Sequence, residues 1–260
     1  MASIRRILNM FLHPLSRPPK NSHFPVIKKT EVFMKRASIG SVGHLYQSHE
    51  GRPSSKWSHY LDVYDYHFEP IRKRTFDQGV RLIEIGVAEG GSLEVWQRYF
   101  GPKSQIVGID IQPQVTGSLG TTITLVTGSQ SDSKVVDEAC SVLGGAVDVV
   151  IDDGSHRGRD QIRTFEMLWS RLSEGAVYVV EDLHTSYWAE FEGGPGRRGT
   201  FIEYAKLLVD DMHLTYHRRP RTKMGHVAAR SIESIAFYDS MVVLTKGSRT
   251  NPSRVDFGQR

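Results

Sequence analysis

Short apolar runs alternate with amphipathic stretches through the central part of the chain. The runs are rich in valine and isoleucine and lie at residues 81–85, 105–109, 122–126, 147–151 and 176–180. Between them, apolar residues recur at three- and four-residue intervals, which predicts helices at residues 92–100, 134–143 and 159–172. Because neighbouring parallel strands need a crossover connection, this order predicts a Rossmann-like, doubly wound α/β fold with a mostly parallel sheet.

Two more strands bring the predicted sheet to seven. Residues 234–238 and 241–246 are separated by Asp239 and Ser240, a hairpin signal that predicts an antiparallel C-terminal strand. Ahead of the sheet, aromatic and apolar residues recur at helical spacing between Trp57 and Phe68. This aromatic face is interpreted as core packing, with the alternative that part of it lines the mouth of a site.

We expect one domain with a segment on either side. Residues 1–53 lack sustained periodicity and form a predicted N-terminal extension, residues 54–248 form the domain, and residues 249–260 form a C-terminal tail. A 39% hydrophobic composition is ample for one core. Within the extension, residues 4–15 predict a short amphipathic helix, which packs on this or a neighbouring subunit, frays, or attaches to a membrane surface.

Composition argues against several classes of protein. The sequence contains no run of about eighteen apolar residues, so we expect no transmembrane segment and a cytoplasmic, at most membrane-peripheral, protein. The single cysteine, Cys140, excludes an intramolecular disulfide and a multi-cysteine metal site. The net charge of +4 comes mostly from the two ends and from residues 218–223, so we expect no nucleic-acid partner. The basic stretch 217–221 is interpreted as a solvated loop, with a grip on an anionic acceptor or RNA as the alternative.

The first predicted strand runs into a glycine-rich turn between Glu84 and Ser92. In an open α/β sheet, ligands bind beyond the carboxyl ends of the strands, and Gly86 and Gly90 let backbone N–H groups approach a ligand closely. The turn departs from the three-glycine dinucleotide fingerprint, and Glu84 offers a carboxylate suited to an amino group. A cofactor with a cationic amino-acid tail therefore fits better, with a purely structural turn as the alternative. Ser92 is placed to cap the helix that follows.

Polar residues also follow the next two strands. Asp110 lies about twenty residues beyond the glycine turn and is suited to accept both hydroxyls of a ribose, which together with the turn indicates a nucleoside-type cofactor. After the third strand, Gln130 lies in a polar segment where an adenine edge could be recognised. Asp132 in the same segment is either a helix N-cap or a ligand contact.

Carboxylates concentrate at the ends of the fourth and fifth strands. Asp152 and Asp153 follow the fourth strand, and Glu181 and Asp182 follow the fifth. Adjacent strand ends lie about 5 Å apart, so Asp153, Glu181 and Asp182 can converge, where they repel one another unless a cation neutralises them. An all-oxygen set of this kind is typical of Mg²⁺ or Mn²⁺.

The loop after Asp153 carries basic side chains. Arg157 and Arg159 are alternative partners of the carboxylates, in a structural ion-pair network without a metal. A histidine side chain can accept a proton at neutral pH, so His156 is interpreted as a general base. Because a metal lowers the pKa of a bound hydroxyl, the two together can form an oxygen nucleophile. His184 is a weaker candidate.

Three motifs, in order and at matching separation, carry a family resemblance. They are Leu-Ile-Glu-Ile-Gly-Val at 82–87 with Gly-Gly-Ser-Leu at 90–93, Ile-Asp-Asp-Gly-Ser-His at 151–156, and Glu-Asp-Leu-His-Thr-Ser-Tyr-Trp at 181–188. Over residues 54–246 the chain resembles the metal-dependent sugar O-methyltransferases of antibiotic biosynthesis, of the mycinamicin, macrocin and rhamnosyl types. Cephalosporin hydroxylase-like proteins share the same body.

The resemblance implies a reaction and a set of residues. A methyl group would pass from S-adenosylmethionine (SAM) to a hydroxyl of a small-molecule glycoside or glycolipid acceptor, while Mg²⁺ or Mn²⁺ chelates neighbouring hydroxyls. The implied metal ligands are Asp153, Glu181 and Asp182, and the implied base is His156. The implied cofactor contacts are Glu84, Gly86, Ser92, Asp110, Gln130 and Asp152. Relatives commonly assemble, so we expect a homo-oligomer.

The chain departs from the family pattern at two places. Gly128-Ser129 stands where the family usually has Gly-Asp, and Ser55-Lys56 stands where it often has Asp-Lys, which leaves Lys56 and His59 as further site candidates. Residues 192–199 predict either a lid over the acceptor or an ordinary surface loop. Two other functions stay open: a hydroxylase or other enzyme on this scaffold, and a binding or regulatory protein without turnover.

Overall fold

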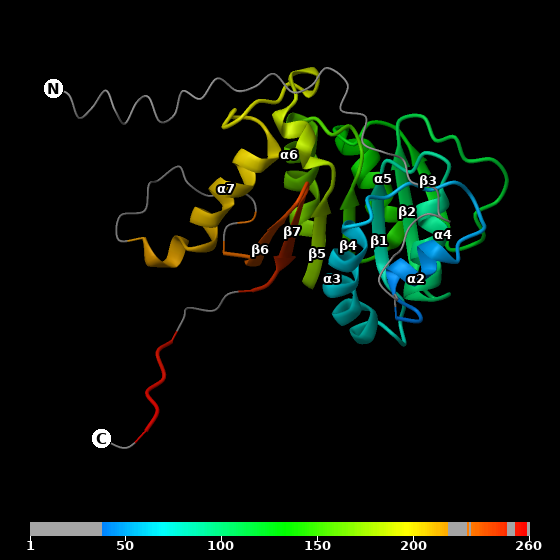
Figure 1. The fold of residues 1–260 in the computed structure, drawn as a ribbon. Coiled ribbons are helices and arrows are strands. Elements are labelled where there is room, and N and C mark those ends of the chain that lie inside the picture. The colour runs from blue at the N-terminus through cyan, green and yellow to red at the C-terminus, as the bar shows by residue number, and fades with distance from the viewer. Residues whose placement is uncertain (1–37, 218–227, 229, 249–252, 259–260) are drawn as a thin grey trace. The chain divides into compact units, whose positions relative to one another are not determined.

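The apolar runs form one seven-stranded sheet within the described residues of this computed structural model, in the order β3-β2-β1-β4-β5-β7-β6 (Figure 1). The structure describes residues 38–217, 228, 230–248 and 253–258. The predicted helix at residues 4–15 and most of the basic stretch 217–221 therefore lie outside it. Residues Arg36–Arg260 form one structural unit.

The first five strands are parallel and the C-terminal strands form a hairpin, as predicted. β7 is antiparallel to both β5 and β6, so it alone runs against the other six strands of this sheet. The strands are β1 (Arg81–Ile85), β2 (Gln105–Asp110), β3 (Ile123–Thr127), β4 (Val147–Asp152), β5 (Leu172–Val180), β6 (Ile232–Tyr238) and β7 (Met241–Lys246). The predicted fold class is confirmed.

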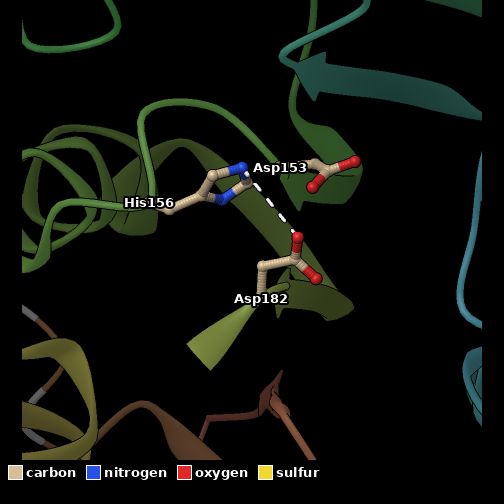
Figure 2. Close-up of side chains that lie close together, drawn as sticks. All are labelled: Asp153, His156 and Asp182. Carbon is tan, nitrogen blue, oxygen red and sulfur yellow. Dashed lines mark ion pairs between the residues drawn. The ribbon is translucent and has the colours of Figure 1, made fainter. Parts of the chain in front are cut away.

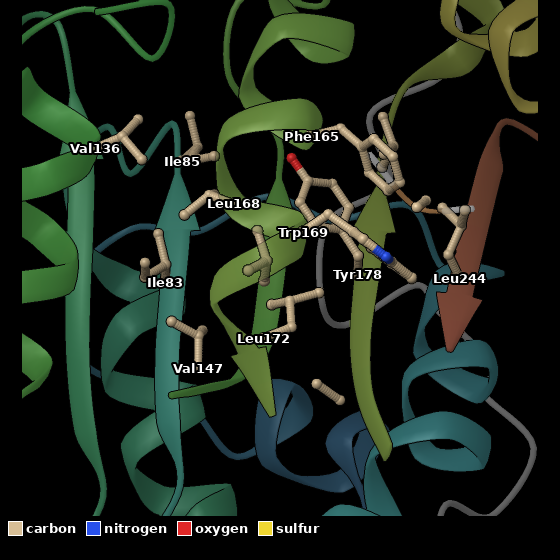
Figure 3. Packing of buried hydrophobic residues seen from close by; sticks show 14 of the residues in the cluster. Ile83, Ile85, Val136, Val147, Phe165, Leu168, Trp169, Leu172, Tyr178 and Leu244 are labelled. Atoms are coloured by element: carbon tan, nitrogen blue, oxygen red, sulfur yellow. The ribbon is translucent and has the colours of Figure 1, made fainter. Parts of the chain in front are cut away.

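Helices cover both faces of the sheet. On one face, α5 (Ser133–Leu143), α6 (Gly158–Leu168) and α7 (Phe201–Met212) bury the main apolar cluster, in which Phe165 packs between Trp169 and Tyr178 (Figure 3). On the other face, α3 (Tyr60–Arg74) and α4 (Gly91–Phe100) pack through aromatic rings. Short 3₁₀ turns complete the described elements: η2 (Trp169–Arg171), η3 (Leu183–Tyr187), η4 (Ala189–Phe191) and η5 (Leu214–Tyr216). No helix in the described ranges is long and apolar enough to span a membrane.

A helix lies before the predicted boundary at residue 53. Helix α2 (Val42–Gln47) packs against α3 and α4, its Val42 side chain is fully buried, and the Val42 N–H donates to Asp65 Oδ1 at 2.8 Å. The hydroxyl of Ser41 caps the helix by accepting from the His44 N–H at 3.1 Å. A six-residue helix is too short for its apolar periodicity to stand out in the sequence.

A buried polar network fixes the end of β4. Gln130, in the loop after β3, donates to Asp152 Oδ1 at 3.0 Å and to Thr164 Oγ1 of α6 at 3.1 Å. Its Oε1 accepts from the Ser155 N–H at 2.7 Å. Burial raises the pKa of Asp152 to about 7. One side chain thus joins the β3 loop, the end of β4 and α6.

The aromatic face of α3 sets a testable packing prediction. Phe68 is fully buried against Tyr64, Trp96 and Phe100. Phe68→Ala should lower the free energy of unfolding by about 3–5 kcal/mol, because it leaves a cavity. Urea denaturation followed by circular dichroism measures this. The matched control is Phe76→Ala, since Phe76 is 79% exposed; its effect should stay within about 0.5 kcal/mol. Equal effects of the two variants would contradict the packing.

The raised pKa of Asp152 makes stability depend on pH. The folded chain holds this proton more tightly than the unfolded chain, so the contribution of Asp152 to stability is present below the ordinary pKa of 3.8 and is lost as pH rises through about 7. Asp152→Asn cannot titrate. Relative to the unsubstituted chain, its free energy of unfolding should therefore be higher at pH 8 than at pH 5, by on the order of 3 kcal/mol. Urea denaturation at both pH values tests this, and an unchanged difference would refute it.

Candidate active site

A pocket of about 300 Å³ opens at the carboxyl ends of the strands β1 to β4. The strand order reverses between β1 and β4, which is where ligands bind in open α/β sheets. Three of the predicted cofactor residues line it: Gly86, Asp110 and Gln130. Gly154 and Arg157, from the loop after β4, also line it.

The glycine-rich turn lies directly on the loop after β4. Gly86 has a φ of +80°, and a Cβ there would overlap the carbonyl oxygen of Asp153, so a larger residue would push the two loops apart. Asp110 Oδ2 accepts from the N–H groups of Val87 and Ala88 at 2.9 and 3.1 Å. The carboxylate that lines the pocket therefore also holds the turn in shape.

The other predicted cofactor residues lie outside the lining of this pocket. Glu84 is fully buried and accepts from Ser92 Oγ at 2.8 Å and from Trp96 Nε1 at 3.1 Å. Burial raises the pKa of Glu84. The expectation that Ser92 caps α4 is wrong, because the helix already begins at Gly91 and the N-cap is Gly90. Asp152 is also fully buried.

Asp153, His156 and Asp182 form a group that could hold a metal ion (Figure 2). One donor atom from each of the three lies within 4.8 Å of the others. The side chains of His156 and Asp182 point toward one another, with 4.0 Å between Nε2 and Oδ2. Both residues have left-handed backbone, with φ values of +54° and +53°, a strained conformation that clusters at active sites.

Glu181, the third predicted metal ligand, points to a lysine instead. Lys56 Nζ lies 2.6 Å from Asp153 Oδ2 and 2.8 and 2.9 Å from the two oxygens of Glu181. The hydroxyl of Tyr64 also donates to Glu181. The three predicted ligands therefore meet at one strand edge, but the group with metal-ligand spacing contains His156 in place of Glu181.

The electrostatics of this cluster follow from burial and close charges. Burial and then Asp153 raise the pKa of Glu181 to about 8, against the opposing effects of Lys56 and Tyr64. Burial alone would lower the pKa of Lys56, but Asp153 and Glu181 raise it well above its ordinary value. Lys56 is therefore a charged ammonium group among carboxylates.

A segment at residues 49–57, which we name the strap, brings Lys56 to the site. The Arg52 side chain pairs with Glu94 of α4 and donates to the carbonyl oxygens of Thr116 and Ser118, each at 2.9 Å. Farther along, Trp57 Nε1 donates to Asp182 Oδ1 at 2.9 Å. The strap thus spans from α4 and the loop after β2 to the acidic group.

The sequence carries little signal for most of these contacts. Lys56 stands out in it only as a departure from a family pattern, and residues 49–53 fall within the predicted extension. The aromatic face of α3 carried a usable signal, since one proposed role was to line a site. The Tyr60 hydroxyl donates to Asp182 Oδ1 at 2.9 Å, and the Tyr64 hydroxyl donates to Glu181. The hydroxyls of this aromatic face thus reach the site while its rings pack in the core.

The alternative partners lie elsewhere. Arg157 and Arg159 pair with Glu192, at 3.8 and 3.4 Å, and not with the predicted metal ligands. His184 contacts Ser240 Oγ at 2.6 Å, and burial lowers its pKa. Two further candidates have structural contacts: Asp132 caps α5 by accepting from the Lys134 N–H at 2.9 Å, and His59 lies 3.2 Å from the carbonyl oxygen of Asp239.

The residues present fit a divalent cation. Two carboxylates whose oxygens lie within 4.8 Å of one another are typical of Mg²⁺ and Mn²⁺ sites. In the described part of the chain, His156 Nδ1 is buried without a hydrogen-bond partner, which is typical of a site completed by a bound group. Imidazole is a less usual ligand of Mg²⁺ than a carboxylate, so His156 can border the ion and still serve as a base.

Comparison with known proteins agrees with the sequence motifs. A methyltransferase domain family matches residues 83–183. The 8-demethyl-8-alpha-L-rhamnosyl tetracenomycin-C 2'-O-methyltransferase of Streptomyces olivaceus is 33% identical over 233 residues, 86% of this chain and 59% of that protein. The mycinamicin VI 2''-O-methyltransferase of Micromonospora griseorubida is 33% identical over 195 residues, 71% of this chain and 47% of that protein.

A solved structure shares the fold. MycE methyltransferase from the mycinamycin biosynthetic pathway, in complex with Mg, SAH and mycinamycin VI, has 30% identity and a TM-score of 0.67, over 80% of this chain and 54% of that one. The chain spans less than two thirds of the length of each of these relatives. Residues 83–183 match a methyltransferase domain family, and the chain is similar in sequence and in fold to the sugar O-methyltransferases.

Proposed function

We propose that this chain is a SAM-dependent, divalent-metal-dependent O-methyltransferase that acts on a hydroxyl of a sugar or of a glycosylated natural product or lipid. One observation carries the proposal, namely that the loop after β4 contributes to both parts of the site. Gly154 and Arg157 of this loop line the pocket, and Asp153 and His156 belong to the acidic group. A methyl donor and a hydroxyl acceptor would therefore meet across a single loop.

The pocket suits the nucleoside part of SAM. Asp110 is placed to accept the ribose hydroxyls, and Gly86 leaves room for the cofactor beside the turn. Gln130 lies at the wall where the adenine edge would be recognised. Glu84, Ser92 and Asp152 lie beneath the residues that line the pocket. Their buried hydrogen bonds hold the glycine-rich turn and the strand ends in place. They would therefore support cofactor binding by fixing the walls of the pocket.

The acidic group suits a metal-assisted proton transfer. Asp153 and Asp182, with Glu181 beside them, would hold a divalent ion, which would supply a Lewis acid that lowers the pKa of the reacting hydroxyl. His156 Nε2 takes the proton of that hydroxyl, the oxygen forms a bond to the methyl carbon, and the bond from that carbon to the sulfur of the donor breaks. Asp182 Oδ2, 4.0 Å from Nε2, stabilises the resulting imidazolium.

The acceptor class rests on the relatives and on the aromatic residues around the acidic group. The relatives are named for the O-methylation of sugars on natural products. In this chain, Phe191 lies 6.2 Å from the His156 ring and 6.2 Å from Trp188, measured between ring centroids. These half-buried rings offer an apolar wall for a sugar ring. A homo-oligomeric assembly stays a prediction.

The other functions are less well supported. A non-haem iron oxygenase uses two histidines and one carboxylate, whereas this group has two carboxylates and one histidine. A binding protein without turnover would have no need for a histidine beside the carboxylates.

Metal removal is the first test of this function. Methyl transfer from SAM to a panel of glycosides, followed by mass spectrometry, should stop in excess EDTA and return with Mg²⁺ or Mn²⁺. Asp182→Asn should lower the rate at saturating SAM by a factor of about 100 or more, because it removes a metal-binding charge. The control Asp62→Asn, an exposed residue in the first turn of α3, should keep the full rate. Undiminished transfer in EDTA would rule out the metal role.

A second prediction concerns the base. His156→Ala should lower methyl transfer by a factor of about 10²–10⁴, the usual contribution of a general base, and leave the affinity for SAM unchanged. The matched control is His213→Ala, an exposed histidine at the end of α7, which should behave like the unsubstituted chain. A variant at position 156 with normal turnover would exclude this role for His156.

A further inference from the structure

We propose that Lys56 is a positioning residue: it supplies a resident positive charge that holds Glu181 and Asp153 in place before a divalent ion binds. The inference deepens the proposed function, since it concerns the same acidic site, but its central part concerns the metal-free protein.

The contacts of Lys56 show what this residue joins. Its Nζ bonds both oxygens of Glu181 and Oδ2 of Asp153, and it lies 3.9 Å from Glu84 Oε1. Three carboxylates from the ends of β1, β4 and β5 thus surround one ammonium group, and the lysine side chain is only 4% exposed. Because Lys56 and Glu181 are almost fully buried, water screens their charges poorly, and the Lys56 ammonium group offsets the repulsion between Asp153 and Glu181.

The strap explains why a lysine can reach this position. It is anchored on α4 through the Arg52–Glu94 ion pair, and a Cβ at Gly91 would overlap the carbonyl oxygens of Arg52 and Pro53, so the strap backbone lies directly on the start of α4. Trp57, the next residue after Lys56, bonds Asp182. The ammonium group is therefore held between the glycine-rich turn and the acidic group by contacts on both sides.

This placement assigns different tasks to neighbouring carboxylates. Glu181 has Lys56 and Tyr64 as partners, whereas Asp153 and Asp182 keep the spacing of metal ligands. A site whose charges are partly compensated remains folded without an ion, and the ion then meets carboxylates that are already in position. Loss of Lys56 should therefore lower the stability of the metal-free protein most, and should lower it less once a bound ion supplies positive charge.

The test is a double-mutant cycle on the full chain, measured by thermal unfolding in EDTA. Lys56→Met leaves the buried carboxyl groups of Glu181 and Asp153 without their ammonium partner and should lower Tm by about 10 °C. In Lys56→Met combined with Glu181→Gln, at least half of this loss should be recovered, because the more deeply buried of the two carboxyl groups is gone. Saturating Mg²⁺ should then raise Tm more for Lys56→Met than for the unsubstituted chain.

Lys246→Met is the matched control. Lys246 is also partly buried, but its Nζ bonds the carbonyl oxygens of Trp169 and Leu172, at 3.0 and 2.8 Å, and not carboxylates. Its loss should lower Tm by an amount that neither Glu181→Gln nor Mg²⁺ changes.

Each outcome decides something. Additive effects of Lys56→Met and Glu181→Gln in EDTA overturn the proposal. If Lys56→Met is unfolded in EDTA, refolding on addition of Glu181→Gln supports the proposal, and failure to refold counts against it. If the coupling is present but Mg²⁺ shifts Tm in none of the proteins, the role of Lys56 stands and the proposed metal centre fails.

Discussion

The arrangement of this site depends on one constraint, the crowding of like charges at the carboxyl edge of a parallel sheet. β4 lies between β1 and β5, and the register pairs Ile85 with Asp152 and Asp152 with Val180. The residues that follow, Asp153 and Glu181, must therefore lie close together, and the burial of Glu181 removes much of the water that would screen the pair. Hydrogen-bond donors from outside the sheet stabilise these carboxylates. They are the Lys56 ammonium group on the strap and the hydroxyls of Tyr60 and Tyr64 on α3.

At the same edge of the sheet, the loop after β4 lies between two chemical environments. On one side, small residues and the Asp110 carboxylate line a pocket of about 300 Å³. On the other, Asp153, His156 and Asp182 present charge and a proton acceptor. His156 and Asp182 both have a left-handed, strained backbone. Each follows the end of a strand, and their side chains point toward one another in the acidic group.

The fold could be predicted from the sequence because each strand is a short β-branched run and each crossover helix has its own periodicity. Asp153, Glu181 and Asp182 could be predicted to meet because strand ends share one edge in any parallel sheet. That His156, and not Glu181, has metal-ligand spacing with the two aspartates could not be predicted, since it depends on how the side chains point. Lys56 could not, since its position depends on how residues 49–57 lie across the start of α4, a long-range contact with no periodic signal. The cap proposed at Ser92 failed for a local reason, a helix start at Gly91 that turns the Ser92 hydroxyl inward to Glu84.

The most direct test of the account is a calorimetric titration of SAM into the folded chain, with and without Mg²⁺. The account predicts saturable binding of one SAM per chain in both conditions, because the cofactor pocket and the acidic group lie on opposite sides of the loop after β4. Absence of binding to a chain that is folded by circular dichroism would contradict it.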